Sequence, residues 1–215
     1  MKKNENFVIT INRELGSGGR TVGRKLAEKL GVEYYDKAVI KGLQEKLHLT
    51  VEEIEKLKGR KQGWWADFKR QLTGTGVSSN FYIPMKGDDP EMLDTDEVFE
   101  LETEILQGIA EHESCVVAGR SGFYVFRDHP NRVSVLIQAS MPFRVERVSR
   151  KQNMTEEEAR KTIDKIDKMR ENYVQKYTKS SRYDTRNYDL VITMDNLSED
   201  DAAALIMAYV RHTCK

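Results

Sequence analysis

A cluster of glycines followed by an arginine is the feature whose residue types and spacing most directly suggest chemistry. It reads ELGSGGRT over residues 14–21 and follows an apolar, β-branched run at residues 7–11. Three glycines within four positions let backbone N–H groups converge, and the N-terminus of a following helix adds positive charge there. Both properties favour a bound phosphate group. The alternative is a tight strand-to-helix turn that requires glycine only for its dihedral angles.

The loop differs from the usual P-loop pattern G-x-x-x-x-G-K-[S/T]. Counted from Gly18, that pattern places its first glycine at Arg13, its lysine at Gly19 and its hydroxyl residue at Arg20. We therefore predict that Arg20 substitutes for the missing lysine, because arginine binds phosphate oxygens through its forked guanidinium. Thr21 is then expected to supply a hydroxyl group beside a magnesium ion. The complete predicted phosphate-binding set is Gly16, Ser17, Gly18, Gly19, Arg20 and Thr21.

Strands and helices are predicted to alternate along the chain, in an α/β fold. The strand candidates, at residues 7–11, 32–35, 114–118, 132–137 and 189–193, are apolar throughout. Helices are expected at residues 22–30, 37–47, 50–58, 155–177 and 198–211, and from residues 94 and 140 onward. Apolar strands of this kind are typical of a parallel sheet covered by helices on both faces. Ligands of such sheets bind beyond the carboxyl ends of the strands, so the loops after Ile11, Ala118 and Ile137 are expected to form the site.

The composition is that of a single globular domain without an evident macromolecular partner. Of the 215 residues, 39% are hydrophobic and 33% charged, and lysine plus arginine equals aspartate plus glutamate at 35 each. This balance gives no indication of nucleic acid or an anionic membrane as a partner. No secretory signal is visible, no apolar stretch approaches the ~20 residues that span a bilayer, and the histidines lack metal-ligand spacing. Two cysteines without a disulfide framework fit a reducing compartment, so we predict a cytoplasmic protein.

The sequence around the glycine loop resembles a known family. ITINRELGSGGRTVGRKLAEKLGVEYYD, residues 9–36, is similar to the N-terminal signature of the cytidylate kinase-like family. The resemblance continues through VVAGRSGFYVFRDHPNRVSVLIQASMPFRVERV, residues 116–148, and more loosely through residues 165–178. It implies a three-layer P-loop nucleoside kinase fold, with a five-stranded parallel sheet flanked by helices. The single domain, residues 1–215, would carry an acceptor-side insertion at about 37–93 and a lid region at about 144–186.

Membership of this family implies ATP as phosphoryl donor, Mg²⁺, and a pyrimidine monophosphate such as CMP or dCMP as acceptor. Asp36 matches the aspartate that opens the acceptor region, and Arg120 matches the arginine that binds the acceptor phosphate. Three positions on the acceptor side depart from the kinases' pattern, namely Lys37, Ser121 and Gln138. The departures concern the identity of the acceptor rather than the presence of a phosphate loop.

Phosphoryl transfer depends mainly on positioning and on cations around the moving charge. The predicted catalytic residues are Arg20, Arg120 and Arg170, and the predicted substrate-binding residues are Asp36, Arg120, Arg144 and Arg147. Arg144 and Arg147 are three residues apart and are expected on one helix face. The alternatives are a solvated basic surface for these two arginines and a helix N-cap for Asp36.

The leading hypothesis is therefore an ATP-dependent nucleoside monophosphate kinase, acting as a monomer or homodimer on a nucleotide and a small-molecule substrate. Two alternatives remain open from the sequence. Gly19 in the lysine position suits a nucleotide-binding regulatory protein without turnover, and the acceptor-side departures suit a kinase for another small acceptor. A structural α/β domain with a glycine turn is the simplest remaining interpretation.

Overall fold

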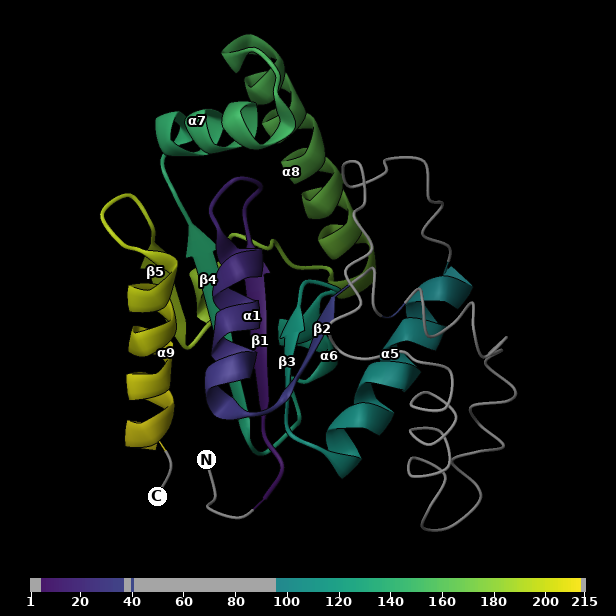
Figure 1. The fold of residues 1–215 in the computed structure, drawn as a ribbon. Coiled ribbons are helices and arrows are strands. Elements are labelled where there is room, and N and C mark those ends of the chain that lie inside the picture. The colour runs from purple at the N-terminus through teal and green to yellow at the C-terminus, as the bar shows by residue number, and fades with distance from the viewer. Residues whose placement is uncertain (1–4, 37–39, 41–95, 214–215) are drawn as a thin grey trace, which may run out of the picture.

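The computed structural model describes residues 5–36, 40 and 96–213, and all structural statements concern these residues. Their centre is a five-stranded parallel sheet in the order β2-β3-β1-β4-β5 (Figure 1). Its strands are β1 (Val8–Arg13), β2 (Glu33–Asp36), β3 (Cys115–Ala118), β4 (Arg132–Gln138) and β5 (Leu190–Thr193). The predicted fold, a parallel sheet of five strands flanked by helices, is confirmed.

Helices cover both faces of the sheet, and two more lie beyond its strand ends (Figure 1). The helices are α1 (Gly19–Leu30), α5 (Asp96–His112), α6 (Gly122–Val125), α7 (Met141–Gln152), α8 (Glu156–Thr178) and α9 (Glu199–Thr213), with a 3₁₀ turn η1 (Thr185–Asn187). α1 and α9 pack on one face, α5 and α6 on the other, and α7 and α8 extend past the carboxyl ends of β1 and β4.

Alternation along the central strands divides the core into two layers. In β1, Ile9 and Ile11 belong to the cluster beneath α1 and α9, whereas Val8 belongs to the cluster beneath α5. In β3, Val116 faces the first cluster and Val117 the second. Since successive strand residues point to opposite faces, an uninterrupted apolar run is what a sheet covered on both faces requires.

Several predicted helix boundaries are confirmed by their capping contacts. α1 ends at Gly31, whose φ of 66° lies in the left-handed region. The Ser140 side chain caps α7, and Thr155 forms a capping box with Glu158 at the start of α8. The short elements α6 and η1 were not predicted, since four and three residues are too few to show a periodicity.

The segment predicted as an acceptor-side insertion, residues 37–93, lies almost entirely outside the described residues. This applies to the helices predicted at residues 37–47 and 50–58, of which only Ile40 is described. Among the described helices, none combines the length and the apolar character needed to cross a membrane.

Candidate functional site

The glycine loop connects β1 to α1 and turns sharply above the sheet. Gly16 and Gly18 have φ angles of 85° and 87°, in the left-handed region that favours glycine. A β-carbon on Gly16 would also lie 2.9 Å from the carbonyl oxygen of Arg144 in α7. The Ser17 hydroxyl donates to the Glu14 carbonyl at 3.0 Å and fixes the turn from within. The loop therefore requires glycine both for its conformation and for its close approach to α7.

The first turn of α1 is arranged to receive an anion. Its N-cap is Gly18, which provides no side-chain hydrogen bond, and the first turn contains no acidic residue. α7 and α8, by contrast, are capped by a serine and a threonine side chain. The N–H groups that begin a helix have no partner within the helix, and the helix dipole favours negative charge beside them. A phosphate group is the ligand that fits this end of α1.

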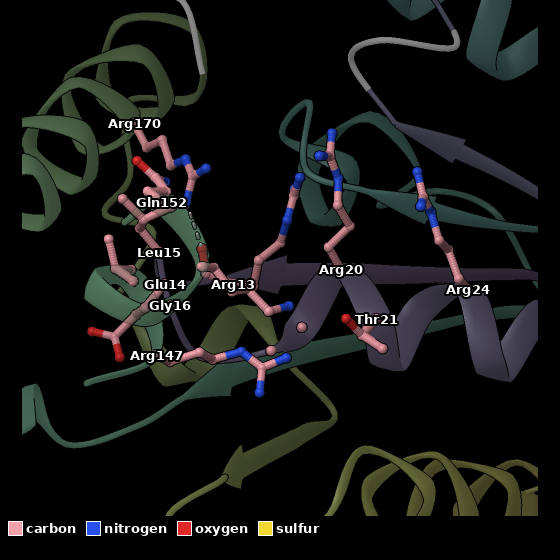
Figure 2. A pocket seen from close by; sticks show the side chains of 14 residues that line it. Arg13, Glu14, Leu15, Gly16, Arg20, Thr21, Arg24, Arg147, Gln152 and Arg170 are labelled. Atoms are coloured by element: carbon pink, nitrogen blue, oxygen red, sulfur yellow. Dashed lines mark hydrogen bonds between the residues drawn. The ribbon is translucent and has the colours of Figure 1, made fainter. Parts of the chain in front are cut away.

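A pocket of about 550 Å³ opens above the loop. One wall is formed by most of residues 13–21 together with Arg24, and the other by α7 and α8 (Figure 2). Six of its side chains are cationic against a single carboxylate, Glu14. The cations are Arg13, Arg20, Arg24, Arg147, Lys151 and Arg170. Charges of one sign around a cleft concentrate its electric field and attract a ligand of the opposite sign, so the pocket suits a polyanion.

The crowding of positive charge is reflected in the pKa of Lys151. Partial burial lowers this pKa below its ordinary value, and the neighbouring Arg147 guanidinium lowers it further. Both causes disfavour the charged form of the amine. A bound anion would relieve the repulsion, as expected of a group in a binding site.

Arg20 and Asp36 meet beside the pocket. The Arg20 Nε donates to Oδ2 of Asp36 at 3.0 Å, and Arg24, one helical turn later, brings Nη2 to 4.0 Å of the same oxygen. Asp36 is only 1% exposed, so its carboxylate is held by these cations at the carboxyl end of β2. The side chain of Arg20 is therefore directed toward the predicted acceptor side, as well as lining the pocket.

Arg120 does not line this pocket. It follows β3 with a φ of 53°, and its guanidinium pairs with the Glu102 carboxylate of α5. The guanidinium carbon lies 4.8 Å from the centre of the Tyr173 ring in α8. Both charged side chains are nearly inaccessible, at 6% and 5% exposure. The structure thus places Arg120 between α5 and α8, away from the phosphate loop's own pocket.

Arg144 and Arg147 diverge, although their spacing predicts a common helix face. Arg147 lines the pocket and pairs with Glu199 of α9. Arg144 is buried, with Nη1 2.5 Å from Oδ2 of Asp167 and 3.7 Å from Oε1 of Glu14. Residues three apart differ by about 60° around a helix axis, and the two long side chains here reach different partners, Arg144 in α8 and Arg147 in α9.

Arg170 lines the pocket from α8, and Arg182 lies beneath it. Nη1 of Arg170 donates to the carbonyl oxygen of Arg13 at 3.5 Å, and Nη2 of Arg182 donates to the same oxygen. Arg182 is completely buried, and its Nη1 lies 3.4 Å from Oδ1 of Asp167. The structure therefore brings Arg20, Arg147 and Arg170 of the predicted cations to one pocket, with Arg144 behind it.

The residues present near the loop suit a magnesium ion only together with a phosphate ligand. Thr21, the predicted metal ligand, contributes a hydroxyl group to the pocket. Among the residues that the structure describes, no group of three or more His, Cys, Asp or Glu side chains is arranged to hold a metal. Mg²⁺ is commonly held by substrate phosphates and water with few protein ligands, and a threonine hydroxyl fits that donor set.

Sequence reasoning missed several residues of the site. Arg24 follows Arg20 by four positions on α1, a spacing that places both on one helix face and was available as a signal. Arg13 occupies the position of the first glycine in the usual P-loop pattern, and this departure from the pattern was a signal that could have identified it. Asp167 was marked only as the first residue of the D-x-x-R pattern that ends at Arg170. Lys151 carried no comparable signal, because only the packing of α7 brings it to the loop.

Solved structures share the fold across nearly the whole chain. An uncharacterized protein from Eubacterium ventriosum ATCC 27560 has a TM-score of 0.67 at 23% identity, covering 96% of this chain and 99% of its own. A gluconokinase from Sinorhizobium meliloti 1021 has a TM-score of 0.51 at 13% identity, with coverages of 98% and 94%. A shikimate kinase from Bacteroides thetaiotaomicron has a TM-score of 0.50 at 16% identity, with coverages of 95% and 98%. At these identities the likeness shows the P-loop kinase fold alone.

Sequence comparison gives the family. No curated protein matches the chain. The model of the cytidylate kinase-like family matches residues 8–196, from the start of β1 past the end of β5. The match includes the phosphate loop, the end of β3 and both helices beside the pocket, so the chain belongs to the cytidylate kinase-like family.

Proposed function

We propose that this protein transfers the γ-phosphoryl group of ATP to a nucleoside monophosphate, with CMP or dCMP as the first acceptors to test. The observation that carries the proposal is the cationic pocket formed by the glycine loop, the N-terminus of α1 with its glycine N-cap and the arginines of α7 and α8. The family assignment supports nucleotide-dependent phosphoryl transfer of the kinase type. The choice among acceptors rests on the resemblance to cytidylate kinases.

In the proposed reaction an acceptor phosphate oxygen bonds to the γ-phosphorus while the bond from that phosphorus to the β–γ bridging oxygen breaks. The electron pair of the broken bond stays on the bridging oxygen, which leaves as part of ADP. Backbone N–H groups of residues 16–21 would hold the donor phosphates, and Arg20, Arg147 and Arg170 would offset the negative charge around them. Mg²⁺ would supply further charge compensation, with Thr21 as its ligand from the protein.

The acceptor is expected beyond the ends of β2 and β3. Asp36 pairs in register with Ala118, so Asp36 and Arg120 follow neighbouring strands at the same edge of the sheet. Beside Arg120, the Ser121 hydroxyl is buried and has no hydrogen-bond partner among the described residues. A buried polar group without a partner is costly, and a polar acceptor group is one way to satisfy it. These features support an acceptor subsite near Arg120.

A different small acceptor is the second candidate, and one contact favours it. The Arg120 guanidinium, which the resemblance assigns to the acceptor phosphate, pairs here with the carboxylate of Glu102. An acceptor phosphate would have to share or replace this partner. An acceptor without a phosphate group would leave the pair intact, and the solved structures that share the fold include kinases named for shikimate and gluconate.

The deciding experiment measures ADP release from Mg²⁺–ATP across a panel of acceptors, namely CMP, dCMP, UMP, AMP, GMP, shikimate and gluconate. Arg20→Ala removes a cation of the pocket, and Arg120→Ala removes the cation of the acceptor subsite. Lys161→Ala is the matched control, since Lys161 is an exposed cation of α8 paired only locally with Glu157. We expect turnover with CMP or dCMP, its loss in both arginine variants, and unchanged turnover in the control.

The other outcomes identify the alternatives. Turnover with shikimate, gluconate or another non-nucleotide acceptor would replace the acceptor assignment and keep the kinase. Binding of ATP in calorimetry without turnover on any acceptor would favour the nucleotide-binding regulatory protein. If no nucleotide binds, the loop is a structural turn. The cytoplasmic location and the monomeric or homodimeric state stay predictions from the sequence.

A further inference from the structure

We propose that Arg13 supplies the positive charge that the P-loop lysine supplies in the usual pattern, so that the cation has moved from the first residue of α1 to the last residue of β1. The inference rests on the proposed binding of ATP at the glycine loop. It changes the prediction made from the sequence, which assigned this role to Arg20. Four observations carry it, two on the space and backbone at Gly19 and two on how Arg13 is placed.

The first observation is that the side chain of Arg13 fills the space that a side chain at position 19 would need. A β-carbon on Gly19 would lie 2.6 Å from Cβ of Arg13, 3.2 Å from its Cγ and 3.3 Å from Cβ of Ile137. Cβ atoms cannot move without the backbone, so these contacts are not relieved by a change of rotamer. A lysine at position 19 and the present side chain of Arg13 therefore exclude each other.

The second observation is that the backbone does not require glycine at position 19. Gly16 and Gly18 have positive φ angles, whereas Gly19 is not among the residues with positive φ. Gly19 also begins α1, where any residue with ordinary helical dihedral angles is tolerated. Glycine at this position is thus explained by the neighbouring Arg13 side chain and not by the conformation of the loop.

The third observation is the direction in which Arg13 extends. Its guanidinium reaches Gly119, just after β3, where a β-carbon would overlap Nη1 and would lie 3.5 Å from Cζ. Arg13 lines the pocket, and Figure 2 shows its side chain extending in the same direction as Arg20 and Arg24. The guanidinium therefore lies between the phosphate loop and the strand end that leads to Arg120. A transferred phosphoryl group would pass between the same two regions.

The fourth observation compares the contacts that position Arg20 with those that position Arg13. Arg20 donates from Nε to the buried Asp36 at 3.0 Å, which orients it toward β2 and offsets part of its charge. The backbone of Arg13 is fixed instead, because its carbonyl oxygen accepts from Arg170 and from the fully buried Arg182. A cation whose backbone is fixed beside the loop is better placed to stabilise charge on the β- and γ-phosphate oxygens as the bond from the γ-phosphorus to the bridging oxygen breaks.

A reciprocal exchange tests the inference with the full-length protein. Arg13→Gln retains a side-chain stem beside Gly19 and removes the charge, and we expect it to lower kcat about 10²–10³-fold, as loss of one stabilising group does. Arg13→Gly combined with Gly19→Lys restores the first glycine and the lysine of the usual P-loop pattern and should recover at least tenfold over Arg13→Gly alone. Gly19→Lys alone should lose both activity and thermal stability, because Arg13 still fills the space. Lys161→Ala serves as the control.

Turnover in Arg13→Gln within a few-fold of wild type would overturn the inference. So would a double variant that folds, by its thermal unfolding, and is no more active than Arg13→Gly. Arg13→Lys covers the case in which the neutral variants fail to fold, since it keeps the stem and the charge and should remain within about tenfold of wild type.

A binding measurement separates this inference from the proposed kinase activity. Calorimetry with ATP and with AMP should show ATP affinity falling at least tenfold in Arg13→Gln, while AMP affinity changes less than twofold. If wild type binds ATP but phosphorylates no acceptor, the kinase proposal fails and this comparison still decides the role of Arg13. An equal loss for ATP and AMP overturns the inference, and so does a wild-type protein that does not bind ATP.

Discussion

Asp167 is the residue on which the charged groups behind the pocket converge. Its carboxylate accepts from the backbone N–H of Leu15 at 3.0 Å and pairs with Arg144 and Arg182. Its neighbours therefore come from the phosphate loop, from α7 and from the segment after α8. A buried carboxylate between two buried guanidinium groups fixes these three parts of the chain relative to one another.

Replacing Asp167 with Asn should destabilise the protein by about 3–5 kcal/mol, because the buried Arg182 would lose its carboxylate partner and the buried Arg144 would keep only the more distant Glu14. The free energy of unfolding in urea measures the effect. Asp164→Asn removes an exposed carboxylate one turn earlier on the same helix and should change stability by less than about 0.5 kcal/mol. Equal effects of the two substitutions would contradict the central position of Asp167.

Gly16 and Gly31 both have positive φ angles, but only Gly16 is also closely packed against another element. Gly16→Ala should cost more than about 1–2 kcal/mol, since the left-handed penalty adds to a contact of 2.9 Å with the Arg144 carbonyl. Gly31 also has positive φ, but nothing lies within 4 Å of a β-carbon there, so Gly31→Ala should cost only the conformational penalty. Calorimetry should show weaker ATP binding for Gly16→Ala alone. Equal loss of binding in both variants would refute the assigned role of the loop.

At the scale of elements, the contact between α5 and α8 encloses the side chain of Arg120. The rings of Phe99 in α5 and Tyr177 in α8 stack with centroids 4.2 Å apart and planes within 8°. Tyr173, one turn earlier on α8, meets Phe99 edge-on and carries Arg120 over its ring. The aromatic contact joins α5 to α8 directly, and Arg120 joins them a second time, through its ion pair with Glu102 of α5 and its position over the Tyr173 ring of α8.

A double-mutant cycle can measure this helix contact. Phe99→Ala and Tyr177→Ala should show a coupling energy of about 0.5–1.5 kcal/mol in urea unfolding, as stacked aromatic pairs do. The control pair is Phe99→Ala with Tyr209→Ala, because α9 lies on the other face of the sheet (Figure 1). Its effects should add within about 0.5 kcal/mol. Additivity in both pairs would mean that the rings do not stabilise the contact.

The whole molecule is organised around a sheet whose inner groups are shielded from solvent. Cys115 of β3 is fully buried, and burial, aided by nearby Glu113, raises the pKa of its thiol to about 12. Burial likewise raises the pKa of the Tyr188 hydroxyl to about 12. Both groups are neutral in the folded protein at pH values where they ionise in the unfolded chain.

Stability should therefore fall as pH rises from about 9 toward 12, since the folded state retains protons that the unfolded chain releases. Urea midpoints at pH 8, 9, 10 and 11 measure the slope, and Cys115→Ala should make it shallower between pH 9 and 10 without altering it below pH 8. In a Cys214→Ser background, a thiol reagent at pH 8 should modify the protein only after unfolding. Rapid labelling of the folded protein would contradict the burial of Cys115.

Local features of this fold can be predicted from the sequence because they depend on residues that are neighbours along the chain. The apolar run that becomes β1, the glycines of the loop, the capping box at Thr155 and the stop at Gly31 are each formed within a few positions of the chain. The parallel sheet follows from strands apolar on both faces. Together with the family resemblance, these features predicted the fold and the position of the phosphate loop.

The tertiary structure decided which charged side chains meet. Arg120 pairs with Glu102, Arg144 with Asp167, and the Arg13 carbonyl with Arg182. Arg13 and Arg182 are separated by 169 positions, so no rule based on sequence spacing could connect them. Two arginines of one helix can also reach different elements, as Arg144 does with Asp167 of α8 and Arg147 with Glu199 of α9.

The phosphate loop combines both kinds of information. Its glycines and its position between a strand and a helix were determined by the sequence alone, because phosphate binding at a helix N-terminus uses contiguous backbone. The reason for glycine at position 19 was decided only in three dimensions. Arg13 lies six residues earlier, and the turn of the loop returns the chain so that its side chain fills the space above the first residue of α1.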